Sequence, residues 1–245
     1  MSQGASNHPD VPLRAVDALT PELLRTECPG LEPGSTALFD IDSTVMNTAS
    51  RNLQILREAA ERWPQLQPAV SRIRQEQLGW NIFEPLERSV GFTDELREVI
   101  RLFWKERFFS DAYLLYDEPY PQVRELLGWL RDSGIRLVYL TGRDLPNMSS
   151  GTIASFRRHR LPLDQRSRFI FKPTFEESDA AFKARSCEEL AREERVVLAV
   201  ENEPGNANLM RRYFPEALVA LIETVTSPEP EVPEPGILQF SRYAV

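Results

Sequence analysis

Two aspartates follow an apolar run near the beginning of the chain. The stretch ALFDIDSTV, residues 37–45, runs through apolar side chains and then places Asp40 and Asp42 two positions apart. Such a run is typical of a buried strand, and burying ionised carboxylates is costly unless a cation or strong donors compensate. The two acids therefore either lie on a solvated rim or converge on a metal or a substrate.

Polar groups also follow three later apolar runs. They are Thr141-Gly142-Arg143-Asp144 after IRLVYL, Lys172 after RFIF with Lys183 one predicted helix further on, and Glu201-Asn202-Glu203-Pro204 after RVVLAV. In a doubly wound sheet, ligands bind beyond the carboxyl ends of the strands. If these runs are strands of one such sheet, acids, an amide, a hydroxyl and a lysine arrive at one edge.

Five apolar runs predict the strands of that sheet: TALFDI (36–41), IRLVYLT (135–141), RFIF (168–171), RVVLAV (195–200) and ALVALIE (217–223). Most are continuously apolar, which is typical of strands covered on both faces. Segments with helical character lie between the last four, at 151–160, 178–191 and 204–214. This alternation implies right-handed crossovers, so we predict an α/β fold with a doubly wound parallel sheet.

A long segment, about 48–118, separates the first two predicted strands. It is read as three helices, NLQILREAAERW (52–63), AVSRIRQEQLGW (69–80) and DELREVIRLFWKERFF (94–109), and a fourth helix follows in PYPQVRELLGWLRDSG (119–134). We therefore predict a helical insert over a core made of 1–47 and 119–245. The last part of that core, 227–245, is predicted to be an extended tail rich in proline and glutamate, with ILQF and YAV packing back as a strap.

Together, DIDST (40–44), LTGR (140–143), a lysine and VENEP (200–204) resemble the four signature motifs of the haloacid dehalogenase superfamily of phosphohydrolases. DxDST is the most specific of them, and the order of the four, each after a strand, strengthens the match. The insert directly after the first motif resembles the helical cap called C1 in that superfamily. The resemblance covers roughly 35–225 and implies a Rossmann-like core with a cap at 48–118.

The resemblance implies roles for four residues. Asp40 would be the nucleophile, which attacks phosphorus and forms an aspartyl phosphate. Asp42 would protonate the leaving oxygen and then activate water. Thr141 and the amide of Gly142 would hold phosphate oxygens.

Each of five further residues has two alternative roles. Ser43 and Thr44 either cap the turn after the strand or add minor phosphate contacts, and Arg143 is either an ion-pair partner or a substrate contact. The lysine that screens the charge between nucleophile and phosphate is either Lys183 or Lys172. Lys183 is favoured, because it lies within a predicted helix 18 residues before Glu201, a placement that the resemblance implies for some branches of the family.

The resemblance also implies a magnesium site. Its ligands would be Asp40, the backbone carbonyl of Asp42, and the fourth motif, where Glu201 and Asn202 stand in place of the commoner Asp-Asp or Gly-Asp. An all-oxygen donor set suits Mg²⁺. The Glu201-Asn202 pair departs from the commoner pattern, and this difference bears on the metal affinity and the reaction rate more than on the class of reaction.

The composition of the chain limits the classes of binding partner that we expect. A net charge of −8 and a pI near 5.1 argue against nucleic acid as the main partner. Cys28 and Cys187 lack the spacing of a zinc or disulfide framework, and His8 and His159 are expected at the surface. No apolar stretch is long enough for a membrane helix and no signal pattern is visible, so we expect a cytoplasmic protein.

The sequence thus predicts a Mg²⁺-dependent phosphatase that acts on a small phosphorylated metabolite. A phosphotransferase or mutase would use the same residues, and a binding protein with a decayed site is a third alternative. Asp42 argues against a dehalogenase, which does not need that acid. Arg51, Asn52 and Arg88 are candidate substrate contacts in the cap, although a solvated polar face is the more ordinary interpretation. The substrate and the oligomeric state are not specified.

Overall fold

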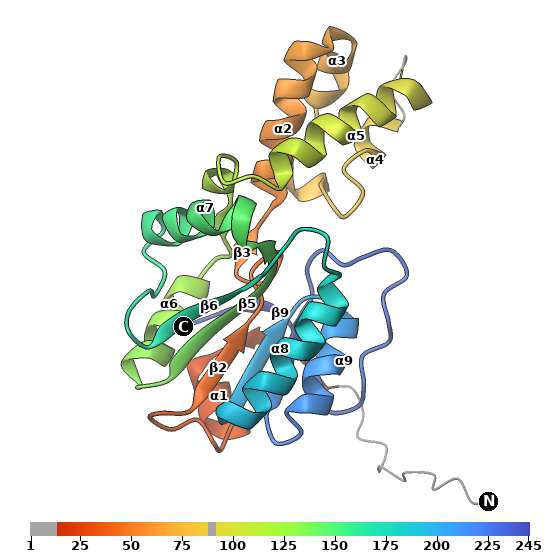
Figure 1. The fold of residues 1–245 in the computed structure, drawn as a ribbon. Helices are drawn as coiled ribbons and strands as arrows, with labels where there is room; N and C mark the ends of the chain where they lie inside the picture. Colours follow the sequence, from red (N-terminus) through yellow and green to blue (C-terminus); the bar gives the residue numbers. More distant parts are fainter. Residues whose placement is uncertain (1–13, 88–91) are drawn as a thin grey trace, which may run out of the picture.

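A parallel sheet forms the centre of the molecule (Figure 1). The computed structural model describes residues 14–87 and 92–245, and this part of the chain builds a seven-stranded sheet and a two-stranded one. The strands of the large sheet are β1 (Arg14–Leu19), β2 (Thr36–Phe39), β5 (Arg136–Asp144), β6 (Ser167–Lys172), β7 (Val196–Glu201), β8 (Leu218–Ile222) and β9 (Leu238–Tyr243). The small sheet pairs β3 (Met46–Asn47) with β4 (Glu118–Pro119) in antiparallel fashion.

Helices connect these strands. They are α1 (Pro21–Glu27), α2 (Ala49–Arg62), α3 (Gln67–Val70), α4 (Glu84–Glu87), α5 (Asp94–Phe108), α6 (Val123–Asp132), α7 (Leu145–Arg158), α8 (Asp179–Glu193) and α9 (Pro204–Tyr213). Short 3-10 helices span Pro64–Leu66, Gln75–Gln77 and Leu114–Tyr116. Among the described residues, no helix combines the length and the apolar character that crossing a bilayer requires.

The strand order confirms the predicted fold class. The order is β1-β9-β8-β7-β2-β5-β6, and every neighbouring pair in it is parallel. The chain moves from β2 outward through β5 and β6 and then crosses to β7 on the other side of β2. The sheet is therefore doubly wound, and its connections reverse direction at β2.

The C-terminal segment differs from the prediction. Instead of a strap, β9 is a strand inside the sheet, where it pairs with β8 on one side and with β1 on the other. The prediction of a tail over 227–245 was therefore wrong for Leu238–Tyr243. These strands were missed because their exposed and buried positions are mixed rather than continuously apolar.

Helices cover both faces of the sheet, which explains the continuously apolar strands. Along β2, Ala37 and Phe39 belong to the apolar cluster that includes residues of α1, α6 and α7. Leu38, which points the other way, belongs to the cluster shared with α8 and α9. Since successive side chains of a strand point to opposite faces, both sets must be apolar in a sheet with two covered faces.

The helices between β3 and β4 have an apolar cluster of their own. Residues of α2, α3, α4 and α5 pack together, with Leu56, Leu86 and Ile100 fully buried among them. They stand beyond the carboxyl ends of the large sheet (Figure 1). The helix predicted over 69–80 is broken, since only α3 and a 3-10 turn form there. The division of the chain into core and cap stays a prediction.

Candidate active site

The end of β2 brings the sequence motifs together. Asp40 follows β2 directly, and its backbone N–H donates to the carbonyl of Val200 in β7 at 3.0 Å. Thr141 lies in β5 on the other side of β2, and Glu201 closes β7. The site therefore lies where the connections reverse, which is the place where open α/β sheets bind ligands.

Asp40 is buried against a lysine. Only 5% of Asp40 is exposed, and Nζ of Lys183 donates to its Oδ1 at 2.8 Å and to Oε2 of Glu201 at 2.7 Å. Burial, reinforced by the charge of Glu201, raises the pKa of Asp40 to about 7, although Lys183 opposes this rise. Burial alone would lower the pKa of Lys183, but the two carboxylates outweigh it and raise that pKa.

The two candidate lysines have different partners. Lys183 projects from α8 to Asp40, whereas Nζ of Lys172 donates to Oδ1 of Asp179 at 2.6 Å. The side chain of Asp179 is 62% exposed, so that pair lies at the edge of the site. Of the two lysines, Lys183 is therefore the one that contacts Asp40.

Asp42 is held by two arginines. Arg143 donates through Nε to Oδ2 of Asp42 at 2.9 Å and through Nη2 to Oδ1 at 2.7 Å. Arg51 donates through Nη2 to the same Oδ1 at 2.8 Å. Burial would raise the pKa of Asp42, but the charges of Arg143 and Arg51 outweigh it and hold the pKa well below its usual range. In this arrangement Asp42 is an ionised acceptor.

Asp117 completes this group of charges and was not predicted from the sequence. Its Oδ2 accepts from Nη2 of Arg143 at 2.6 Å, and its Oδ1 lies 2.9 Å from Nε of Arg51. The side chains of Arg51, Arg143 and Asp117 are 0% exposed. A lone aspartate before a short strand gives no sequence signal for such burial, since both partners lie far away along the chain.

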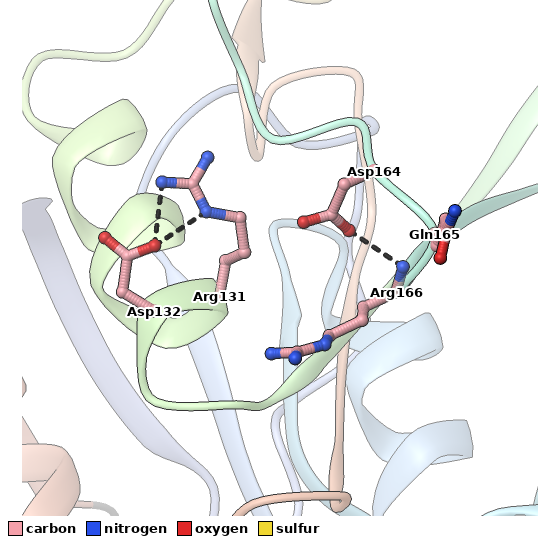
Figure 2. A pocket seen from close by; sticks show the side chains of 5 residues that line it. All are labelled: Arg131, Asp132, Asp164, Gln165 and Arg166. Atoms are coloured by element: carbon pink, nitrogen blue, oxygen red, sulfur yellow. Dashed lines mark hydrogen bonds and ion pairs between the residues drawn. The ribbon is translucent and has the colours of Figure 1, made fainter.

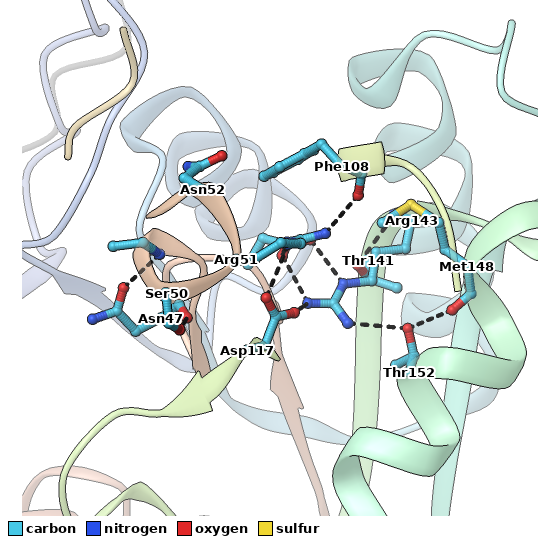
Figure 3. Close-up of polar contacts among 12 residues, drawn as sticks. Asn47, Ser50, Arg51, Asn52, Phe108, Asp117, Thr141, Arg143, Met148 and Thr152 are labelled. Atoms are coloured by element: carbon cyan, nitrogen blue, oxygen red, sulfur yellow. Dashed lines mark hydrogen bonds and ion pairs between the residues drawn. The ribbon is translucent and has the colours of Figure 1, made fainter. Parts of the chain in front are cut away.

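Arg51 and Arg143 are each fixed by further contacts. Arg51 donates to the carbonyl of Phe108 at 2.8 Å, and its Cζ lies 3.8 Å from the centre of that phenyl ring. Arg143 donates to Oγ1 of Thr152 at 3.0 Å. Figure 3 shows Arg51 between Phe108 and Asp117, and Arg143 between Asp117 and Thr152. The solvated polar face expected for Arg51 was therefore wrong.

Asn52, a second candidate cap contact, bonds within the helical segment instead. Asn52 is buried, and its Oδ1 accepts from the indole N–H of Trp104 at 2.8 Å. It thus packs against α5 and is not part of a solvated face. Arg88 lies outside the described residues, as does His8.

The predicted phosphate contacts lie in β5 and in the loop after β2. Thr141 is fully buried, and its Oγ1 accepts from the backbone N–H of Arg143 at 3.2 Å. A Cβ added to Gly142 would lie 2.6 Å from Oδ2 of Asp179, so the chain passes close to that carboxylate. Ser43 has a φ of +61°, which gives the loop after Asp42 its sharp turn.

Thr44 links the first motif to the fourth. Its Oγ1 donates to Oδ1 of Asn202 at 3.0 Å, and its carbonyl accepts from the hydroxyl of Tyr243 at 3.0 Å. The Nδ2 of Asn202 donates to the carbonyl of Val225 at 2.6 Å, which fixes the direction of the amide. The loop that follows Asp40 is therefore supported from both sides.

Hard oxygen donors are present for a divalent cation. None of the described residues donates a hydrogen bond to Oδ2 of Asp40, and the amide oxygen of Asn202 is turned toward the loop that carries Asp42. Oxygen donors of this kind fit Mg²⁺. The oxygen of Asn202 accepts one hydrogen bond, from Oγ1 of Thr44. Both oxygens of Glu201 are engaged, Oε2 by Lys183 and Oε1 by the backbone N–H groups of Asn202 and Glu203.

The acidic side chains alone do not make a metal cluster. Within residues 14–87 and 92–245, no group of three or more His, Cys, Asp or Glu is close enough to hold a metal ion. A cation here would therefore depend on amide and backbone oxygens as well as on Asp40. Metal ligation by Glu201 stays a prediction.

A pocket away from this site is lined by Arg131, Asp132, Asp164, Gln165 and Arg166 (Figure 2). The guanidinium of Arg131 pairs with Asp132 at 2.8 Å, and Asp164 accepts from the backbone N–H of Arg166 at 2.8 Å. It lies beside the start of β6, at the amino ends of the strands, whereas Asp40 lies at the carboxyl ends. None of the sequence motifs falls there, so we assign it no function.

The fold and this site define an α/β protein whose polar centre is a buried aspartate with a lysine partner. Residues 35–207 match the family model of the haloacid dehalogenase-like hydrolases, and the chain belongs to that family. The expected superfamily is thereby confirmed. No functionally curated protein matches the chain.

Several solved structures share the fold. A presumed phosphatase from Clostridium difficile has a TM-score of 0.55 at 12% identity, with 86% of this chain and 95% of that chain covered. A predicted phosphatase from Clostridium acetobutylicum has a TM-score of 0.52 at 13% identity, with 86% and 95% covered. A presumed beta-phosphoglucomutase from Thermotoga maritima has a TM-score of 0.51 at 18% identity, with 85% of this chain and 94% of that chain covered. At these identities the likeness concerns the fold alone.

Proposed function

We propose that this hydrolase is a Mg²⁺-dependent phosphatase, which cleaves a small phosphomonoester through an aspartyl phosphate on Asp40. The observation that carries the proposal is the buried contact of 2.8 Å between Lys183 and Asp40 at the point where the sheet connections reverse. A nucleophilic carboxylate needs a nearby cation to approach an anionic phosphate. Lys183 is fixed by Glu201 in the position to supply that charge.

The proposed reaction has two steps. An oxygen of Asp40 attacks phosphorus, and the bond to the leaving oxygen breaks. Asp42, which first leaves the two arginines and takes up a proton from solvent, gives that proton to the leaving oxygen. Water, deprotonated by Asp42, then attacks phosphorus and releases phosphate from Asp40. Thr141 and the amide of Gly142 would hold the phosphate oxygens through both steps.

Asp40, Asn202 and the backbone carbonyl of Asp42 would hold Mg²⁺. When bound, the ion would neutralise phosphoryl charge and favour the ionised form of Asp40. Since Glu201 is engaged by Lys183 and by two backbone N–H groups, its proposed part is to orient Lys183.

We also infer that residues 48–118 act as a cap. Their own apolar cluster and the short ribbon of β3 and β4 at their base support this division. The ring of Phe109 contacts Phe175 edge to face, with centroids 5.0 Å apart, so the end of α5 meets the loop after β6. Closure of such a segment over the site would exclude water from the phosphoryl group.

The test is phosphate release from a panel of small phosphomonoesters, with Mg²⁺ and with EDTA. We expect turnover only with Mg²⁺, and loss of roughly a thousandfold or more of it in Asp40→Asn, because the nucleophile is removed. The matched control is Asp132→Asn, in which an exposed aspartate paired with Arg131, at the opposite end of the strands, loses the same charge. Turnover that survives in Asp40→Asn would contradict the assignment of the nucleophile.

The same panel separates the alternatives. Cleavage of the ester without release of free phosphate would indicate transfer to another acceptor, as in a phosphotransferase. Folded protein without any turnover would favour a binding protein. In Asp42→Asn, we expect a loss of about 10²–10⁴-fold on alkyl phosphates and a smaller loss on aryl phosphates, whose leaving group needs less protonation.

A further inference from the structure

Asp42 covers a buried pair of arginines. The side chains of Arg51 and Arg143 are 0% exposed, as is that of Asp117, whereas the side chain of Asp42 is 33% exposed. Of these four charged groups, Asp42 is therefore the one that solvent reaches. A molecule that approaches the arginines from the solvent meets Asp42 first.

The four charges balance only while Asp42 stays in place. Two guanidinium groups face two carboxylates, and Asp117, which is fully buried and contacts both arginines, is not free to move. The proposed reaction requires Asp42 to turn toward the leaving oxygen. Nε of Arg143 and Nη2 of Arg51 then lose their acceptor, and one positive charge is left unbalanced in a buried place. Such a charge is costly unless another anion replaces the lost partner.

The donors at this place are shaped for a carboxylate. Arg143 grips Asp42 with Nε and Nη2, one on each oxygen, which is the two-pronged geometry that guanidinium groups use for planar carboxylates. The ring of Phe108 covers the face of Arg51, and Arg51 Nη1 is bound to the carbonyl of Phe108. Thr152 holds Nη1 of Arg143. The remaining donors are thus fixed before any ligand arrives.

We propose that Arg51 and Arg143 form a subsite for a carboxylate of the substrate, which takes the place of Asp42 and leaves Asp42 free to act at the phosphoester oxygen. This inference rests on the proposed phosphatase function. Because Asp42 follows Asp40 by two residues, a carboxylate held in its place lies close to the phosphoryl group. The substrate class is therefore a short phosphorylated carboxylic acid. A phosphomonoester without a second anion leaves Asp42 on the arginines and is cleaved slowly.

The test compares two phosphonates that are not hydrolysed, 3-phosphonopropionate and propylphosphonate, by calorimetry on the full chain with Mg²⁺. They differ in having a carboxylate or a methyl group at the far end. We expect 3-phosphonopropionate to bind roughly tenfold tighter or more, the factor that one charge-assisted hydrogen bond supplies. Equal or weaker binding of 3-phosphonopropionate, or no binding of either compound, overturns the proposal.

Substitutions test whether the arginines cause the tighter binding of the carboxylate compound. In Arg51→Gln the preference for the carboxylate falls to less than about threefold, and the double variant Arg51→Gln/Asp117→Asn, which keeps the buried charges balanced, gives the same loss if the single variant does not fold. The matched control is Arg101→Gln, an exposed arginine of α5 paired with Glu98, which keeps the full preference. An unchanged preference in folded Arg51 variants overturns the proposal.

The two proposals fail in different ways. A carboxylate preference in binding without phosphate release from any phosphomonoester leaves the subsite standing and refutes the phosphatase. Phosphate release from esters with and without a carboxylate at equal kcat/KM refutes the subsite and leaves the phosphatase standing.

Discussion

Removing the cation beside Asp40 should destabilise the fold strongly and in a pH-dependent way. In Lys183→Met, Asp40 and Glu201 keep their burial but lose the ammonium group that bonds both of them, at 2.8 and 2.7 Å. Their side chains are 7% and 1% exposed, so water does not replace the lost partner. Breaking a buried pair by removing one partner costs about 3–5 kcal/mol of unfolding free energy.

We expect this loss at pH 8 in EDTA, measured by urea unfolding followed through tryptophan fluorescence. For a chain of this size it corresponds to a drop of roughly 6–20 °C in melting temperature. Burial and Glu201 already raise the pKa of Asp40 to about 7 with Lys183 present, and its removal raises that pKa further. The folded state then binds a proton that the unfolded state releases above its ordinary pKa near 4. Lowering the pH from 8 to about 5 therefore favours the folded variant and shrinks the deficit.

The control is Lys172→Met, which removes the same group from a pair whose acid, Asp179, is 62% exposed. Exposed pairs contribute about 0–1 kcal/mol, so this variant should stay close to the wild type at both pH values. Equal losses in the two variants, or a Lys183→Met deficit that grows on acidification, would refute the reasoning about the buried pair.

Two further predictions concern positions outside the site. Burial raises the pKa of Cys28 to about 11 and that of Cys187 to about 12, so neither thiol should react with a disulfide reagent in native protein below pH 9, while both react in urea; rapid native labelling would contradict this burial. Gly151→Ala should lower the unfolding free energy by about 1–3 kcal/mol, because a Cβ there lies 2.3 Å from the backbone oxygen of Asp111. Gly128→Ala, in α6 with nothing within 4 Å, should instead gain about 0.5–1 kcal/mol, and urea midpoints of the two variants check the opposite signs.

The centre of the sheet could be predicted from the sequence because its strands are buried on both faces. The run TALF gives β2 with every residue buried, and RVVLAV gives the fully buried β7. The edge of the sheet formed by β1 and β9 could not be predicted in the same way. The burial pattern of β1 is mixed, and its partner β9 lies more than two hundred residues away, as in the register of Arg14 with Leu238. No local sequence pattern predicts that two strands so far apart along the chain will pair.

The candidate site shows the same division. Asp40, Thr141 and Glu201 could be placed together because each lies at or near the carboxyl end of a strand, and these ends meet at one edge of a parallel sheet. The neighbours of Asp42 could not be placed in this way, since Arg51 lies in the first turn of α2 and Asp117 precedes a two-residue strand. The contact of Arg51 and Asp117 with each other depends on how the segment between β3 and β4 packs. In the sequence, buried polar residues of this segment cannot be told apart from solvated ones.

The position of β9 makes the assembly of the sheet wait for the end of the described chain. β1 finds its neighbour in β9, which lies between it and β8, so a nascent chain holds β1 unpaired until residues 238–243 have left the ribosome. The same segment ends in Tyr243, whose hydroxyl holds the carbonyl of Thr44 beside the proposed nucleophile. Docking of this one segment therefore completes the β1 edge of the sheet and supports the loop after Asp40 at the same time.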